Sequence, residues 1–100
     1  MSMETRKLLT IVTEAALESE LVVAIQALGA HGYTVSDARG KGSRGVRGAS
    51  WAPSANVRIE VVCTSATATA IADALRTRYY DDYAMILFVG DVEVMRPAKF

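Results

Sequence analysis

The stretch Asn56-Val57-Arg58-Ile59-Glu60-Val61-Val62-Cys63 decides the fold class of this chain of 100 residues. An apolar side chain stands at every second position from Val57 to Cys63, and successive side chains of a strand point to opposite faces. Valine and isoleucine also favour strands. The stretch therefore predicts a β-strand whose odd-numbered side chains share one face.

The residues that follow this strand change to a helical period. From Ala66 onward an apolar stripe recurs at helical spacing, and its members are Ala68, Ile71, Ala72, Leu75 and Tyr79. Thr64 or Ser65 is suited to cap the first turn, because a side-chain oxygen there accepts a free backbone N–H. After this predicted helix, the apolar run from Tyr83 to Val89 predicts another strand, with an extended continuation past Gly90.

The residues before Asn56 show the same order of a strand followed by a helix. Residues 8–12, Leu-Leu-Thr-Ile-Val, predict a short strand covered on both faces. A helical stripe follows, with Thr13 as its expected cap and Gly29 as its expected stop; the stripe consists of Leu17, Leu21, Ile25 and Leu28. Tyr33-Thr34-Val35 then predicts a strand before the glycine-rich region that begins at Gly40.

The order of elements is therefore βαββαβ in a single domain, residues 1–100. This order is typical of the α+β ferredoxin-like fold, in which two helices cover one face of a four-stranded antiparallel sheet. Valine, isoleucine and leucine are expected on both faces of all four strands. Because an apolar sheet face in water is a large exposed patch, we expect self-association to bury it.

Composition excludes several classes of protein. Hydrophobic residues make up 51% of the chain and charged residues 22%, the balance of an ordered domain. The apolar runs are far shorter than the roughly 20 residues that cross a bilayer, and no signal-peptide core follows the polar start. The single cysteine, Cys63, excludes a disulfide framework. We expect a cytoplasmic protein with no membrane span.

One basic segment interrupts a chain whose formal net charge is zero. Five of the eleven lysine and arginine residues lie between Asp37 and Glu60, with no acidic residue between these two positions. The segment Gly40-Lys41-Gly42-Ser43-Arg44-Gly45-Val46-Arg47-Gly48 holds four glycines in nine positions, which lets backbone N–H groups approach a ligand. Its two arginines suit bidentate contacts with phosphate. We therefore expect this loop, at about residues 40–56, to bind a phosphate-bearing ligand.

The basic segment has other interpretations. A solvated surface loop without a ligand stays open as the plain alternative. The spacing of glycines and lysine does not match a Walker A loop, and no helical pattern follows, so nucleotide hydrolysis gains no support. The central strands lack the aromatic pair with which ferredoxin-like sheets stack RNA bases, so we expect no nucleic-acid binding.

The remaining residues assemble no catalytic or metal-binding constellation. His31 is the only histidine and has no second one with which to share a metal. Asp81 and Asp82 are neighbours at a helix end, where they point in different directions. Cys63 ends an apolar strand, which favours a buried thiol. Trp51 has no evident core to join and is a candidate contact for a partner or ligand. We expect no enzyme.

Four segments together carry a resemblance to a known family. They are residues 9–14 (LTIVTE), 29–35 (GAHGYTV), 40–47 (GKGSRGVR) and 80–84 (YDDYA). The pairing of Gly-Tyr-Thr-Val with Gly-Lys-Gly-Ser-Arg at this separation is the most specific part. On these segments the chain resembles the PII-like signalling proteins, closest to the subgroup associated with carboxysomes and bicarbonate transporters.

The resemblance implies a homotrimer of ferredoxin-like subunits with an adenine nucleotide in each intersubunit cleft. It also implies a mobile loop after the second strand that reports the ligand state. The residues that it implies for nucleotide binding are Tyr33, Thr34, Gly40, Lys41, Gly42, Ser43, Arg44, Arg47, Gly90 and Glu93. The loop side chains would face the phosphates, and Gly90 would lie near the base.

Two departures from the PII proteins proper change the implied ligand. The chain lacks their modified tyrosine at the loop tip. It also lacks their glycine-rich, lysine-bearing segment before the last strand, whose place Gly90-Asp91-Val92-Glu93 takes. ADP or AMP is therefore implied rather than ATP with 2-oxoglutarate, and cyclic AMP is an alternative. Bicarbonate is a further implied ligand at the loop. A cysteine-containing extension typical of transporter-associated relatives is also absent, which favours the carboxysome-associated kind.

We therefore expect a regulatory protein of inorganic-carbon metabolism that signals through its mobile loop to a bicarbonate transporter or a carboxysome-related protein. Two alternatives stay open. One is a cyclic-nucleotide-sensing regulator of a bicarbonate transporter. The other is an interaction protein whose basic loop binds an acidic partner without any small ligand.

Overall fold

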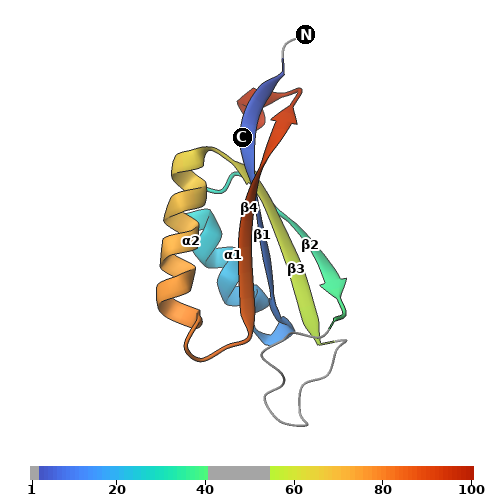
Figure 1. Cartoon of the computed structure of the whole chain (residues 1–100), viewed down its shortest axis with the longest axis vertical. Coiled ribbons are helices and arrows are strands. Elements are labelled where there is room, and N and C mark those ends of the chain that lie inside the picture. The colour runs from blue at the N-terminus through green and yellow to red at the C-terminus, as the bar shows by residue number, and fades with distance from the viewer. Residues whose placement is uncertain (1–2, 41–54) are drawn as a thin grey trace.

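The computed structural model of the chain describes residues 3–40 and 55–100, and its elements follow the predicted order (Figure 1). The strands are β1 (Glu4–Glu14), β2 (Thr34–Ala38), β3 (Asn56–Cys63) and β4 (Met85–Val94). The helices are α1 (Glu18–Ala27) and α2 (Ser65–Tyr79). Two short turns of 3₁₀ helix are η1 (Ala15–Leu17) and η3 (Pro97–Lys99).

The four strands form one antiparallel sheet in the order β2-β3-β1-β4. The central strand β1 pairs with β3 as far as Lys7, whereas its pairing with β4 continues to Glu4. The start of β1 and the end of β4 therefore extend beyond β3 as a two-stranded ribbon, at the top of Figure 1. β2 and β4 are the two edges of the sheet.

Both helices lie on one face of the sheet (Figure 1). The odd-numbered side chains of β1 and β3 point to this face and form the core with α1 and α2. Its fully buried apolar members are Leu9, Ile11, Leu21, Ile25, Val57, Ile59, Val61, Ile71 and Leu75. Burial of each such side chain contributes about 1.5 to 3 kcal/mol. The predicted α+β ferredoxin-like fold is confirmed.

The two helices begin in different ways. Thr64, one of the two residues predicted to cap α2, is its cap. Its Oγ1 accepts the backbone N–H of Thr67 at 3.3 Å. The prediction that Thr13 caps the first helix is wrong. Thr13 lies within β1, and its hydroxyl donates to the carbonyl oxygen of Ala84 at 3.1 Å. The turn η1 leads into α1 without a side-chain cap.

The end of α1 depends on Gly29, as the sequence predicts. Gly29 has a φ of +115°, a conformation that side chains with a Cβ rarely adopt. This turn lets the N–H of Gly29 reach the carbonyl of Gln26 at 3.2 Å, and the N–H of Ala30 reach that of Ile25 at 3.0 Å. These two bonds form a Schellman motif, which satisfies the last carbonyls of the helix.

The face of the sheet opposite the helices, here called the open face, is only partly apolar. Valine, isoleucine and leucine are expected on both faces of all four strands, and this is wrong for β2, whose open face carries none of them; on the open face of β3 only Val62 is of this kind. Their open face carries Thr34, Ser36, Arg58 and Glu60. The apolar side chains lie on β1 and β4 and at Val62 of β3, beside Leu8. On β4, Ile86 is 56% exposed and Phe88 is 50% exposed. Only this half of the open face needs an apolar cover.

Gly29→Ala is expected to lower the free energy of unfolding by about 1 to 2 kcal/mol, because the left-handed conformation disfavours a Cβ. The added Cβ would also lie 3.2 Å from Oγ1 of Thr67. Gly32→Ala is the matched control, since a Cβ there meets no described residue within 4 Å and the φ of Gly32 is not positive. Urea denaturation measures both variants, and equal losses would contradict this explanation.

Candidate functional site

Four polar side chains follow one another along β2 and β3 on the open face, and we call them the polar strip: Thr34, Ser36, Arg58 and Glu60. Ser36 lies opposite Arg58, and Thr34 lies opposite Glu60. Successive rows on one face of a sheet are roughly 6.6 Å apart. Ala38 and Asn56 form the last pair between β2 and β3, and the basic loop connects these two strands beyond this pair. The polar strip therefore leads from the base of that loop toward the middle of the sheet.

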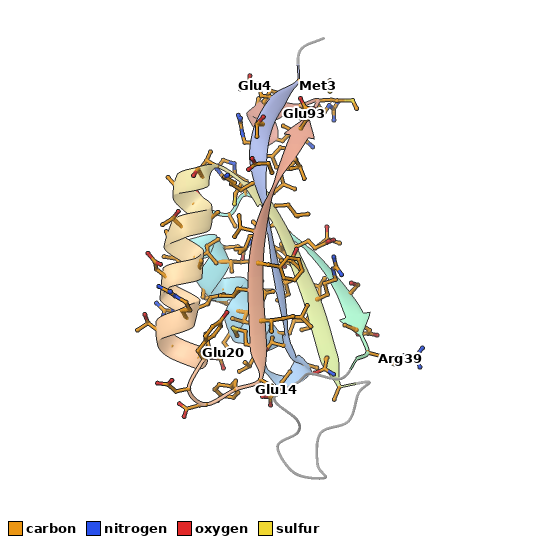
Figure 2. All side chains as sticks on the ribbon, in the orientation of Figure 1. Met3, Glu4, Glu14, Glu20, Arg39 and Glu93 are labelled. Atoms are coloured by element: carbon orange, nitrogen blue, oxygen red, sulfur yellow. The ribbon has the colours of Figure 1, made fainter. Side chains whose placement is uncertain are left out.

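Backbone pairing and a backbone hydrogen bond fix the residues on both sides of the basic loop. Ala38 pairs with Asn56, which is buried, and the carbonyl of Ala55 accepts the N–H of Ala15 at 2.8 Å. Arg39 follows β2 at this end, and Figure 2 shows its side chain directed away from the sheet. The Arg39 guanidinium therefore lies just beyond the last residue of β2 and points away from the polar strip.

An ion pair occupies the middle of the polar strip. Arg58 donates from Nε and from Nη2 to the same oxygen of Glu60, each at 3.3 Å. Both side chains are partly exposed, so the pair contributes little to the stability of the fold. Its effect is local, because the guanidinium neutralises a carboxylate that would otherwise repel an anionic ligand.

Thr10 of β1 lies directly opposite Glu60 and is fully buried. Its hydroxyl makes no hydrogen bond to any residue within 3–40 and 55–100. A buried hydroxyl without a partner costs about 1 to 3 kcal/mol. On the other side of Thr10 lies Phe88 of β4, which belongs to an apolar patch of the open face formed by Leu8, Val12, Ile86 and Phe88. Thr10 thus stands where the polar strip meets the apolar patch.

Three of the predicted binding residues border the polar strip. Tyr33 precedes β2 and is 41% exposed, and Thr34 is itself part of the strip. Gly40 follows β2 at the base of the loop, where an added Cβ would meet no described residue within 4 Å. The loop residues of the prediction lie outside the described residues; they are Lys41, Gly42, Ser43, Arg44 and Arg47.

The last two predicted residues lie elsewhere in the subunit. Gly90 and Glu93 belong to the second half of β4, and Figure 2 shows Glu93 and Arg39 at opposite ends of the molecule. The expectation that residues 90–93 replace the segment before the last strand is wrong, because they lie inside that strand. Residues 80–84 form that segment instead. One subunit therefore does not bring Glu93 to the base of the loop.

A groove of about 510 Å³ lies on the other side of β4, between this strand and α2. Its two lining cations are already neutralised: Arg76 pairs with Asp73 at 3.2 Å, and Lys7 pairs with Asp91. The groove shares no residue with the polar strip. It therefore suits an anionic ligand less well than the base of the loop.

The remaining candidates show no reactive arrangement in the part of the chain that the structure describes. His31 Nδ1 lies 3.4 Å from the carbonyl oxygen of Lys99. Burial raises the pKa of the Cys63 thiol, which disfavours the reactive thiolate. Among residues 3–40 and 55–100, no three histidine, cysteine or acidic side chains gather as a metal site. No helix within those ranges is long and apolar enough to cross a membrane.

Comparison with known proteins identifies the family. The sequence model of the family described as nitrogen regulatory protein P-II matches residues 6–99. The chain belongs to the PII family. A PII-like signalling protein from Thermus thermophilus is 41% identical to it, with a TM-score of 0.85, over 100% of this chain and 99% of that one. The resemblance predicted from the sequence is thereby confirmed for the family.

A second PII-like relative, CPII from Thiomonas intermedia, shares the fold. Its structure bound to ADP and bicarbonate is 24% identical to this chain, with a TM-score of 0.85, and covers 99% of this chain and 97% of that one. Another CPII structure, bound to ADP, AMP and bicarbonate, is 23% identical with a TM-score of 0.84, over 99% of this chain and 96% of that one. At these identities the likeness shows the fold alone.

In this PII-family chain, residues 80–84 form a turn near the same end of the molecule as the end of β2 and the start of β3 (Figure 1). Glu14 accepts the N–H of Ala84 at 3.1 Å, which ties the turn to β1. The Tyr79 hydroxyl donates to Glu20 at 2.6 Å, which ties the end of α2 to α1. Burial, and then the Glu20 carboxylate, raise the pKa of Tyr79 to about 12.

Tyr79→Phe is expected to lower the free energy of unfolding by about 1 kcal/mol at neutral pH, through loss of one hydrogen bond. The advantage of wild type should shrink as pH rises from about 10, the usual tyrosine pKa, to about 12, the pKa of Tyr79. In that window the unfolded chain releases the proton first, so stability falls with pH. Urea denaturation at neutral and alkaline pH measures this. A pH-independent difference would contradict the assignment.

Proposed function

We propose that the chain is a regulatory protein that binds an adenine nucleotide, with ADP or AMP favoured. The observation that carries the proposal is the polar strip, which leads from the base of the basic loop across β2 and β3 on the face that no helix covers. Membership of the PII family supports it. The structure of CPII, which shares this fold, is bound to ADP, AMP and bicarbonate.

The phosphates of such a nucleotide, and its sugar and base, are proposed to contact different parts of the chain. In this proposal the phosphates lie at the basic loop, where guanidinium and ammonium groups and glycine backbone N–H groups bind phosphate oxygens. The groups concerned belong to Gly40, Lys41, Gly42, Ser43, Arg44 and Arg47. The sugar and base lie along the strip toward Thr34 and the exposed ring of Tyr33.

We place this site between copies of the chain rather than within one. Gly90 and Glu93 lie far from the base of the loop in their own subunit, so they contribute only to a neighbour's site. Association is supported by the apolar patch, in which Ile86 and Phe88 are half exposed or more. An exposed apolar surface of this kind favours burial against another protein surface. The proposed assembly is a homotrimer with a nucleotide in each cleft.

The proposed role is signalling in the cytoplasm rather than catalysis. The basic loop reports the ligand state to a partner, which we propose to be a bicarbonate transporter or a carboxysome-related protein of inorganic-carbon metabolism. Bicarbonate is proposed as a second ligand at the loop. ATP and cyclic AMP are the alternative nucleotides, and calorimetry distinguishes them from ADP and AMP.

Calorimetric titration with ADP, AMP, ATP and cyclic AMP tests the proposed function. Arg44→Ala is expected to weaken ADP binding roughly 10- to 150-fold, because a hydrogen bond to a charged group contributes about 1.5 to 3 kcal/mol. Arg78→Ala, which removes an exposed arginine of α2, should leave the affinity unchanged. If none of the four nucleotides gives a binding heat, the proposal is wrong and the interaction protein without a small ligand remains.

Phe88→Asp is expected to convert the trimer to monomers, because it places a charge in the apolar patch that the assembly buries. Light scattering coupled to gel filtration measures the mass of the particle. Val23→Asp is the control, since Val23 is 68% exposed on α1, on the face of the sheet that the helices cover. A wild-type protein that is monomeric, or a Phe88→Asp variant that stays trimeric, would rule out this interface.

A further inference from the structure

Glu60 has three neighbours on the open face that can donate to a carboxylate, Arg58, Thr10 and Thr34, and Thr34 is the one whose hydroxyl is exposed to water. Its carboxylate accepts two bonds from Arg58 on the same strand. Thr10 lies directly opposite, fully buried, with a hydroxyl that has no partner within the described ranges. Residues opposite each other in a sheet have Cβ atoms about 4.5 to 5.5 Å apart. A change of rotamer therefore brings the Glu60 carboxylate within reach of that hydroxyl.

Arg58 occupies the row of the polar strip between the base of the loop and the row of Thr34 and Glu60. In the proposed site the phosphates lie at the loop and the sugar along the strip, so the phosphate that is joined to the sugar lies over this row, beside Arg58. Phosphate carries more charge than a carboxylate and presents several acceptor oxygens to the guanidinium fork. The phosphate therefore competes with Glu60 for Arg58. Once displaced, the Glu60 carboxylate is repelled by the phosphate beside it.

We propose that Glu60 is a two-position switch in the nucleotide site, an inference that rests on the proposed function. Without ligand, Glu60 pairs with Arg58, and the hydroxyl of Thr10 has no partner among the described residues. With a phosphate on Arg58, the Glu60 side chain turns to Thr10 and accepts a hydrogen bond from its hydroxyl. Because the buried hydroxyl is satisfied only in the bound state, Thr10 stabilises the bound form selectively.

The switch discriminates between nucleotides and nucleosides. Adenosine carries no phosphate, so it leaves the pair of Arg58 and Glu60 intact and gains nothing from Thr10. AMP and ADP release Glu60 and gain the additional hydrogen bond. Thr10 is therefore a positioning residue that acts on the ligand through Glu60, without touching the ligand itself.

Thr10→Val tests the switch, because valine has nearly the shape of threonine but no hydroxyl. Calorimetry is expected to show ADP and AMP binding weakened on the order of fivefold. Adenosine affinity, measured by competition against ADP, is expected to stay at its wild-type value. Thr10→Ser keeps the hydroxyl and should bind ADP like wild type. Thermal unfolding without ligand should give Thr10→Val a midpoint no lower than that of wild type, since a buried unpaired hydroxyl is removed.

Three results would overturn the switch, and they can be told apart. Equal affinity of wild type and Thr10→Val for ADP removes the switch and leaves the proposed function intact. Equal weakening of ADP and adenosine also removes it, because the hydroxyl then acts on every ligand alike. A wild-type protein that gives no heat with ADP overturns the switch together with the proposed function.

Discussion

The structure depends on one constraint: both helices pack against the same face of a four-stranded sheet. The odd-numbered side chains of β1 and β3 therefore form the core, and the even-numbered ones lie on a face that the subunit cannot cover by itself. Such a face is stable when it is polar or when another molecule buries it. In this chain one half of the open face is polar and the other half is apolar. The proposed ligand site lies on the polar half, and the proposed assembly buries the apolar half.

The polar half of the open face carries one ion pair, between Arg58 and Glu60, on the face that no helix covers. The pair is partly exposed and contributes little to folding, so in the proposed site its position bears on recognition of the ligand rather than on stability. The ion pairs along the groove between α2 and β4 leave that groove without an unpaired lining cation among the described residues. In the proposed site, phosphate therefore binds at the loop and the polar strip rather than in this groove.

Periodicity predicts the order of the elements and their buried faces, because each depends on residues close together in the sequence. The alternation over residues 57–63 matches the buried side of β3. The predicted continuation of the last strand past Gly90 is confirmed, because the pairing of Gly90 with β1 needs no side chain; the resemblance alone placed residues 90–93 before that strand, and this is wrong. The sequence does not predict Arg58, Glu60 and Thr10 as part of the site that is proposed here. Thr10 and Glu60 become neighbours only when β1 and β3 align in register, and no local pattern encodes that register.

The most direct test of the central claim, that the open face holds a nucleotide between copies of the chain, is a crystal structure grown with ADP. This account predicts a trimer whose apolar patches are buried against neighbouring subunits. It places ADP along the polar strip with its phosphates at the base of the basic loop, and Glu60 turned from Arg58 to Thr10. ADP bound in the groove between α2 and β4, or a monomer whose open face stays free of ligand, would contradict it.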